Sequence, residues 1–84
     1  MIIINYRNIM KTLADMSAGE TAFVIKINAK DELKQRLFSF GLRKNSVVKI
    51  KATSMAKSTM EIEIGTMLLA LRYEEAKSIL VGEG

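Results

Sequence analysis

Hydrophobic residues recur along this chain with two different periods, one typical of strands and one typical of a helix. The stretch Thr21–Ile27 is rich in β-branched and aromatic residues and predicts a strand that is apolar on both faces. From residue 31 to residue 40 the spacing changes, because Leu33, Leu37 and Phe40 fall about one helical turn apart. This second stretch therefore predicts an amphipathic helix.

Local signals mark both ends of the predicted helix. Asn28 is expected to cap the N-terminus, because an asparagine side chain accepts hydrogen bonds from the first free N–H groups of a helix. Gly41 follows the last apolar position and suits the left-handed conformation that commonly ends a helix. Leu42 would then cover Leu37. We therefore expect the chain to turn sharply after residue 40.

Two half-buried strands follow the helix and predict a hairpin centred near Ala56. In each of them, apolar residues alternate with charged residues or threonine. The expected cross-strand pairs are Val48 with Ile64, Lys49 with Glu63, Ile50 with Ile62 and Lys51 with Glu61. Each pair would contribute roughly 0.2–1 kcal/mol. The hairpin would thus have one apolar face and one face that carries a ladder of opposite charges.

The remainder of the chain predicts two more strands and one helical turn. A turn at Gly65 leads into Thr66–Arg72, which is expected to be a largely buried strand. Tyr73–Lys77 predicts a short helical turn, and Ile79–Val81 predicts a closing strand before a frayed tail at residues 82–84. The expected fold class is mainly β, a small SH3-like barrel of about five strands with one amphipathic helix and a short C-terminal helical turn.

Length and composition predict one domain without chemistry of its own. Eighty-four residues are too few for a second core. The chain has no Cys and no His, which removes disulfides, the commonest general base and the usual zinc ligands. Its six Met residues are weak metal ligands that more often fill gaps in a core, so we expect no tight iron binding by this chain alone, no cofactor and no enzymatic activity.

Apolar runs are short throughout the sequence. The longest ones fall far below the roughly 20 residues that a membrane span needs. The first residues also lack the basic and apolar regions of a secretory signal. We therefore expect a cytoplasmic protein that is not embedded in a membrane.

Positive charge is concentrated in the middle of the chain, within a total of +4. Between Leu33 and Met60 there are seven basic residues and no acid, whereas the rest of the chain has six basic and nine acidic residues, so that +7 and −3 add to +4. Nucleic-acid binding by a small barrel would need aromatic stacking residues in this basic stretch. Phe38 and Phe40 belong to the predicted helix, so no nucleic acid is expected as a partner.

Three sequence blocks follow one another along most of the chain: Leu13-Ala-Asp-Met-Ser-Ala-Gly-Glu20, Arg36-Leu-Phe-Ser-Phe-Gly-Leu42 and Ala70-Leu-Arg-Tyr-Glu-Glu-Ala76. In this order they resemble the FeoA family, small cytosolic components of bacterial ferrous iron uptake. The resemblance departs from the family pattern at Ala18 and Lys44, where proline is usual, and at Asn45, where glycine is usual. Asn also tolerates the left-handed conformation, so the turn after the helix is expected to persist. The family-like domain is expected at residues 10–81, after an N-terminal extension at residues 1–9.

The resemblance implies a non-catalytic role in iron transport. Such a protein would bind the cytosolic part of the GTP-dependent FeoB-type membrane transporter and modulate it. Two alternatives are an SH3-like regulatory module that acts on a metal-responsive transcription factor, and an unrelated nucleic-acid-binding barrel. The protein is expected to be a monomer or a weak, strand-swapped homodimer. The candidate partner-binding residues are Phe23, Arg36, Arg43, Lys44 and Met55.

Overall fold

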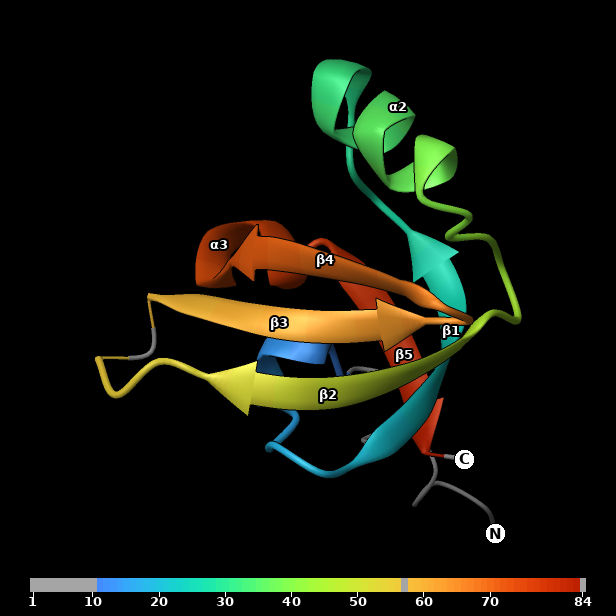
Figure 1. Ribbon diagram of the computed structural model, residues 1–84. Helices are drawn as coiled ribbons and strands as arrows, with labels where there is room; N and C mark the ends of the chain where they lie inside the picture. The colour runs from blue at the N-terminus through green and yellow to red at the C-terminus, as the bar shows by residue number, and fades with distance from the viewer. Residues whose placement is uncertain (1–10, 57, 84) are drawn as a thin grey trace, which may run out of the picture.

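Five antiparallel strands form one sheet that bends around a single core (Figure 1). The computed structural model describes residues 11–56 and 58–83. Its elements are η1 (Leu13–Asp15), β1 (Thr21–Ile27), α2 (Asp31–Ser39), β2 (Val47–Thr53), β3 (Thr59–Ile64), β4 (Met67–Arg72), α3 (Tyr73–Ala76) and β5 (Ile79–Glu83). The strand order is β4-β3-β2-β1-β5, so the first strand in the chain pairs with the last.

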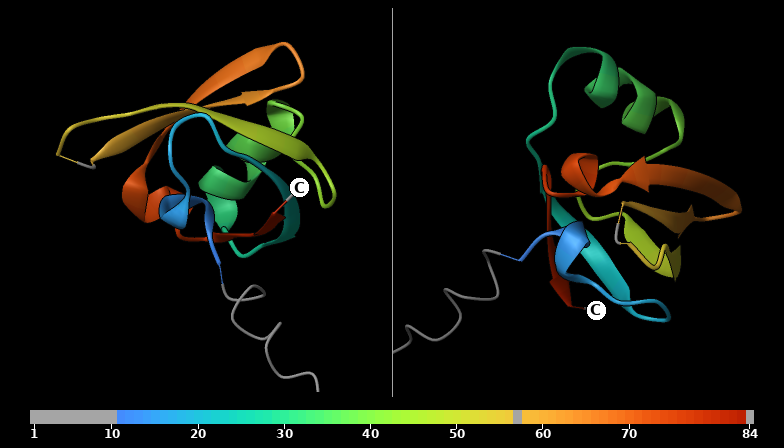
Figure 2. Two further views of the ribbon diagram at one scale, coloured as in Figure 1. Left: turned by 90° about the horizontal axis from the view of Figure 1, so that it is seen from below. Right: turned by 90° about the vertical axis from the view of Figure 1, so that its left-hand side faces the viewer.

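The inner face of the sheet carries the alternating apolar positions that the sequence predicts. Ala22 and Val24 of β1 are buried, and so are the matching positions of the other strands. The fully buried large side chains are Leu13, Val24, Leu37, Leu42, Val48, Ile50, Ile62, Leu71, Ile79 and Val81, with Met60 almost so. Figure 2 shows η1 and α3 at the open side of the curved sheet, which they help to close. The predicted fold class is confirmed, except that β4 and β5 remain the two edges of the sheet.

The β2–β3 hairpin has the predicted register near its base and departs from it near its tip. Val48 pairs with Ile64, Lys49 with Glu63 and Ile50 with Ile62, as expected. A bulge after Ile50 then shifts the register, and Glu61 lies opposite Ala52. The expected pair of Lys51 with Glu61 is therefore wrong, because the bulge places an extra residue in β2. Lys49 and Glu63 both lie in the described part of the chain, and no ion pair joins them.

Helix α2 ends as the sequence predicts and begins differently. Gly41 has a φ of 91°, and the N–H of Leu42 donates to the carbonyl oxygen of Leu37 at 3.0 Å, which is a Schellman ending. The N-cap is Lys30, with no side-chain cap, so the expected role of Asn28 is wrong. The N–H of Asn28 bonds to the carbonyl oxygen of Ser78 instead, which extends the β1–β5 pairing by one residue.

Two expectations for the C-terminal half also need correction. Strand β4 is an edge strand rather than a largely buried one, and only Leu69 and Leu71 of its six residues are buried. The tail expected at residues 82–84 is wrong for Gly82 and Glu83, which belong to β5 and pair with β1. The N-terminal extension expected at residues 1–9 lies outside the described residues.

Candidate protein-binding groove

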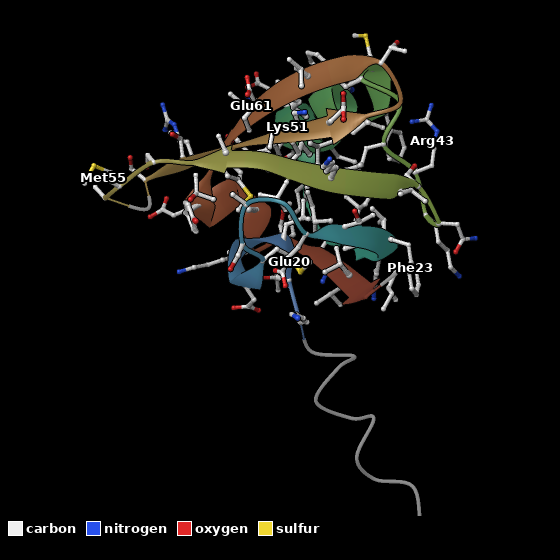
Figure 3. All side chains as sticks on the ribbon, turned by 60° about the horizontal axis from the view of Figure 1, so that its bottom comes forward. Glu20, Phe23, Arg43, Lys51, Met55 and Glu61 are labelled. Atoms are coloured by element: carbon white, nitrogen blue, oxygen red, sulfur yellow. The ribbon has the colours of Figure 1, made fainter. Side chains whose placement is uncertain are left out.

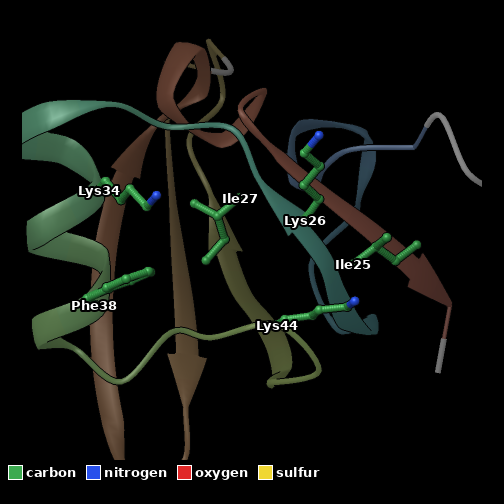
Figure 4. Close-up of a pocket in the computed structure, with 6 residues that line it drawn as sticks. All are labelled: Ile25, Lys26, Ile27, Lys34, Phe38 and Lys44. Carbon is green, nitrogen blue, oxygen red and sulfur yellow. The ribbon is translucent and has the colours of Figure 1, made fainter.

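A groove of about 520 Å³ lies between β1 and the helix α2 (Figure 4). Its lining residues are Ile25, Lys26, Ile27, Lys34, Phe38 and Lys44. Ile25–Ile27 come from the end of β1, Lys34 and Phe38 from one face of α2, and Lys44 from the loop that leads to β2. Lys34, Phe38 and Ile27 thus extend toward one another across the groove, whereas the side chains of Ile25 and Lys26 extend on the other side of β1 (Figure 4).

The β1 wall of the groove follows from an irregularity in that strand. Between Val24 and Lys26 the pairing of β1 with β5 shifts register, as in a β-bulge. Ile25 and Ile27 are half-buried, whereas Ala22 and Val24, earlier in the strand, are fully buried. The sequence predicts β1 to be apolar on both faces. The bulge reverses the alternation, so Ile27 pairs with the buried Ile79 and packs against the core, while Ile25 stays on the outer face; both residues line the groove.

On the helix side, the Phe38 ring contacts two cations. The Arg43 guanidinium lies 4.6 Å from the ring centroid, and the Lys34 amino group lies 5.7 Å from it. Arg43 also donates from Nη1 to the carbonyl oxygens of Phe38 and Leu42, both at 2.9 Å. Such cation–π contacts contribute about 0.5–1 kcal/mol at exposed sites. They keep a ring that is 38% exposed oriented over the groove.

Lys44 is positioned by a tight turn after the helix. The N–H of Arg43 donates to the Ser46 hydroxyl oxygen at 2.8 Å, and the N–H of Ser46 donates to the carbonyl oxygen of Arg43 at 3.0 Å. Asn45 takes the left-handed conformation within this turn, with a φ of 75°. The persistence of the turn despite the missing glycine is thereby confirmed. It leaves Lys44 exposed at the margin of the groove.

The five predicted site residues do not form one cluster. Lys44 lines the groove, and Arg43 contacts it through Phe38. Met55 is fully exposed at the tip of the β2–β3 hairpin, at the opposite end of the molecule from Phe23 and Arg43 (Figure 3). These positions confirm that Met55 is accessible, but they place it far from the groove.

Phe23 and Arg36 each have a partner within the chain. Phe23 lies opposite Gly82, and its ring approaches the position that a Cβ atom at Gly82 would occupy to 2.7 Å. Arg36 donates from Nη2 to Oε1 of Glu75 at 3.0 Å, which joins α2 to α3. The predicted basic cluster of Arg36, Arg43 and Lys44 is therefore divided between an internal ion pair and the groove.

Glu75 has a lowered pKa because it accepts two hydrogen bonds. The largest contribution is the backbone N–H of Arg72, which donates to Oε1 at 3.0 Å. The Arg36 guanidinium lowers the pKa further, while partial burial opposes both effects. The carboxylate thus caps α3 and anchors α2, which makes it a structural group rather than a candidate acid or base.

Sequence reasoning missed most of the groove. Ile25, Lys26 and Ile27 come from a strand, and Lys34 and Phe38 from a helix, so their meeting depends on tertiary structure. One signal was available in the helix. Phe38 lies outside the apolar face of Leu33, Leu37 and Phe40, and it shares its own face with Lys34 four residues earlier. A single exposed apolar residue does not by itself indicate a binding surface, so this signal alone did not locate the groove.

The described residues include no cluster of three or more acidic side chains that could hold a metal ion. Within the same ranges, no helix is long and apolar enough to span a bilayer. Among the described residues, the groove thus combines an apolar floor with a cationic margin.

Comparison with known proteins identifies the family. The sequence matches the FeoA domain over residues 11–83, and the chain belongs to this family. It is 40% identical over 70 residues to a Campylobacter jejuni protein named as an Fe(2+) transport protein A, a match that covers 83% of this chain and 95% of that protein. The predicted family resemblance and its connection with ferrous iron transport are thus confirmed.

Solved FeoA structures share the fold. The FeoA protein from Chlorobium tepidum is 27% identical, with a TM-score of 0.82, over 87% of this chain and 70% of that chain. Stenotrophomonas maltophilia FeoA, solved in complex with zinc and described as an SH3 domain protein, is 27% identical with a TM-score of 0.75, over 84% of this chain and 88% of that one. The SH3-like assignment is therefore confirmed.

Proposed function

We propose that this protein is a non-catalytic, cytoplasmic accessory of ferrous iron transport that binds the cytosolic part of an FeoB-type transporter. Membership of the FeoA family supports the connection with iron transport. The observation that carries the binding role is the groove, in which Phe38 stays 38% exposed and extends toward Ile27 (Figure 4). Exposed apolar side chains that gather at a concave site indicate a place for a partner.

Binding would act on transport by shifting a conformational equilibrium. A protein without chemistry of its own can change a transporter only if it binds two of its states with different affinity. The GTP-bound and nucleotide-free states are the natural pair for a GTP-dependent transporter. Lys44 and Arg43, at and beside the groove, are the proposed charged contacts.

The test is binding of the purified protein to the full-length FeoB-type transporter of the same organism, in detergent, with and without GTP. We expect binding whose affinity differs between the two nucleotide conditions and falls at higher salt, because the contacts include exposed charges. The double variant Arg43→Glu with Lys44→Glu should weaken binding. Its matched control is the single variant Lys51→Glu, which changes an exposed lysine of β2 away from the groove.

Absence of binding by the wild-type protein in all conditions would overturn the proposed function. Binding that is unaffected by the double variant would leave the accessory role in place and exclude Arg43 and Lys44 as its charged contacts. Circular dichroism of each variant would establish that it is folded before affinities are compared.

A further inference from the structure

The edge of β1 that faces the groove has no strand partner beyond Val24 among the described residues. β1 pairs with β2 only from Thr21 to Phe23, and Val24 then exchanges backbone bonds with the loop at Asn45 and Ser46. On its other side, β1 continues to pair with β5 as far as Ile27. The end of β1 at Ile27 therefore extends past the end of β2 and borders the groove.

The direction of the backbone groups at Ile27 follows from the next residue. The N–H of Asn28 points toward β5, since it donates to the carbonyl oxygen of Ser78 at 2.7 Å. In an antiparallel sheet, successive residues direct their N–H and C=O groups to opposite edges. The N–H and C=O of Ile27 therefore point away from β5, toward the α2 side of the strand. These are the groups with which an added strand would pair.

The side chains around this edge of β1 favour a negatively charged ligand. Lys26, Lys34 and Lys44 line the groove, and none of the described acidic residues lines it. Figure 4 shows Lys34 and Phe38 extending from α2 toward Ile27. Arg43 adds a fourth cation, 4.6 Å from the Phe38 ring centroid. A ligand with carboxylates and at least one apolar side chain would match both the margin and the floor.

We propose that the groove binds an extended, acidic segment of the partner protein as an added strand alongside the end of β1 at Ile27. An apolar side chain of the segment packs against Ile27 and Phe38, and its carboxylates pair with Lys34 and Lys44. Main-chain hydrogen bonds provide affinity and side-chain pockets provide specificity in this mode of recognition. The inference rests on the proposed function insofar as it assumes a protein partner, and it adds the chemistry of the bound segment.

A peptide fits these observations better than an anionic membrane surface. A lipid headgroup satisfies the lysines but lacks the neighbouring backbone acceptor and donor that a peptide offers to the outward-pointing N–H and C=O of Ile27. The apolar floor is also recessed between a strand and a helix, whereas a bilayer surface is broad. The free backbone edge and the recessed floor are therefore what distinguish the two occupants.

The test uses synthetic ten-residue peptides with a fluorescent label and measures binding to the full chain by fluorescence anisotropy. A peptide in which Leu and Glu alternate should bind, and a peptide in which Leu and Lys alternate should not. The double variant Lys34→Glu with Lys44→Glu should lose about tenfold or more in affinity for the acidic peptide. The single variant Lys51→Glu should stay within about twofold of wild type, since Lys51 lies on β2 away from the groove.

A second measurement tests the added strand itself. The acidic peptide with alternate backbone nitrogens methylated keeps its charge and side chains but loses donors, and it should bind much more weakly. Hydrogen exchange at the Ile27 amide should slow when the unmethylated peptide binds. Equal binding of the methylated peptide, or unchanged exchange at Ile27, would overturn strand addition.

Further outcomes separate this inference from the proposed function. If the Lys34→Glu, Lys44→Glu variant binds the full-length transporter as well as wild type does, the groove inference is overturned and the proposed function is retained. If the wild type binds the acidic peptide but not the transporter, the groove chemistry is supported and the proposed function fails. Binding to phosphatidylglycerol vesicles without binding to the acidic peptide would overturn the inference in favour of a membrane surface.

Discussion

The contact between Phe23 and Gly82 offers the sharpest test of how the outer face of the sheet is packed. The two residues are cross-strand neighbours on β1 and β5. A Cβ atom added at Gly82 would lie 2.7, 3.0 and 3.3 Å from three atoms of the Phe23 ring, which is closer than carbon atoms approach without strain. The substitution Gly82→Ala must therefore displace the ring.

The expected effect of Gly82→Ala on the free energy of unfolding depends on whether the Phe23 ring is present. Phe23 is 36% exposed and can swing toward solvent, so the cost should lie near the lower end of the range for overpacking, about 1 kcal/mol. Gly82 does not have a positive φ, so alanine suits its backbone. In a Phe23→Ala background, Gly82→Ala should stabilise the protein by about 0.4–1 kcal/mol, through lower entropy of the unfolded chain. The coupling free energy between the two sites should then be about 1.5–2 kcal/mol.

The assay is urea unfolding of the wild type, both single variants and the double variant, followed by circular dichroism. A difference of 1 kcal/mol corresponds to a shift of about 4–8 °C in Tm for a domain of this size, so thermal unfolding provides a second measurement. Additive effects, with a coupling below about 0.5 kcal/mol, would refute the reasoning. They would mean that the ring does not lie over Gly82 in solution.

Four further variants test other parts of the fold. Leu37→Ala removes a fully buried side chain of α2 and should lower the free energy of unfolding by about 2–5 kcal/mol. Leu68→Ala, at an exposed position of β4, should change the free energy of unfolding by less than about 0.5 kcal/mol. A large effect of Leu68→Ala in urea unfolding would contradict the assignment of β4 as an exposed edge. Gly41→Ala should cost about 1–2 kcal/mol in the same assay, because its φ of 91° disfavours any residue with a Cβ atom; a neutral result would contradict the helix ending. The folded protein lowers the pKa of Glu75, so the carboxylate stabilises the fold above the ordinary pKa near 4.5, and this stabilisation is lost as the pH falls through the lowered pKa. Wild type should therefore lose more stability than Glu75→Gln on acidification below about pH 4.5. Parallel profiles of stability against pH for the two proteins would contradict this.

Local chemistry explains which parts of the fold the sequence predicts. The end of α2 depends on Gly41 and Leu42, which are neighbours in sequence, and the predicted ending is confirmed. The buried positions of β3 follow from strict alternation and are also confirmed. The bulge in β2 was missed, because nothing between Ile50 and Ala52 marks an extra residue. A bulge depends on how two strands meet, which the pattern of one strand does not contain.

The residues of the groove were also not predictable from the pattern of a single segment of the sequence. The predicted basic cluster rested on the proximity of Arg36, Arg43 and Lys44 in sequence. In the structure, Arg36 is drawn to Glu75, 39 residues later in the chain. Lys44 instead joins Ile27 and other residues that are far from it in sequence. The density of positive charge along the chain thus predicted that a basic surface exists. Which residues make up that surface could be known only from the tertiary fold.

The pairing of the first strand with the last bears on how the protein folds. Ala22 pairs with Glu83 and Ile27 with Ile79, so these contacts close loops of 61 and 52 residues. Contacts between such distant residues slow folding, because the entropy of loop closure must be lost before they form. During synthesis, β1 emerges early and must wait for β5 with apolar residues such as Val24 uncovered. A chaperone that holds this strand until residues 79–83 have been translated would raise the yield of folded protein.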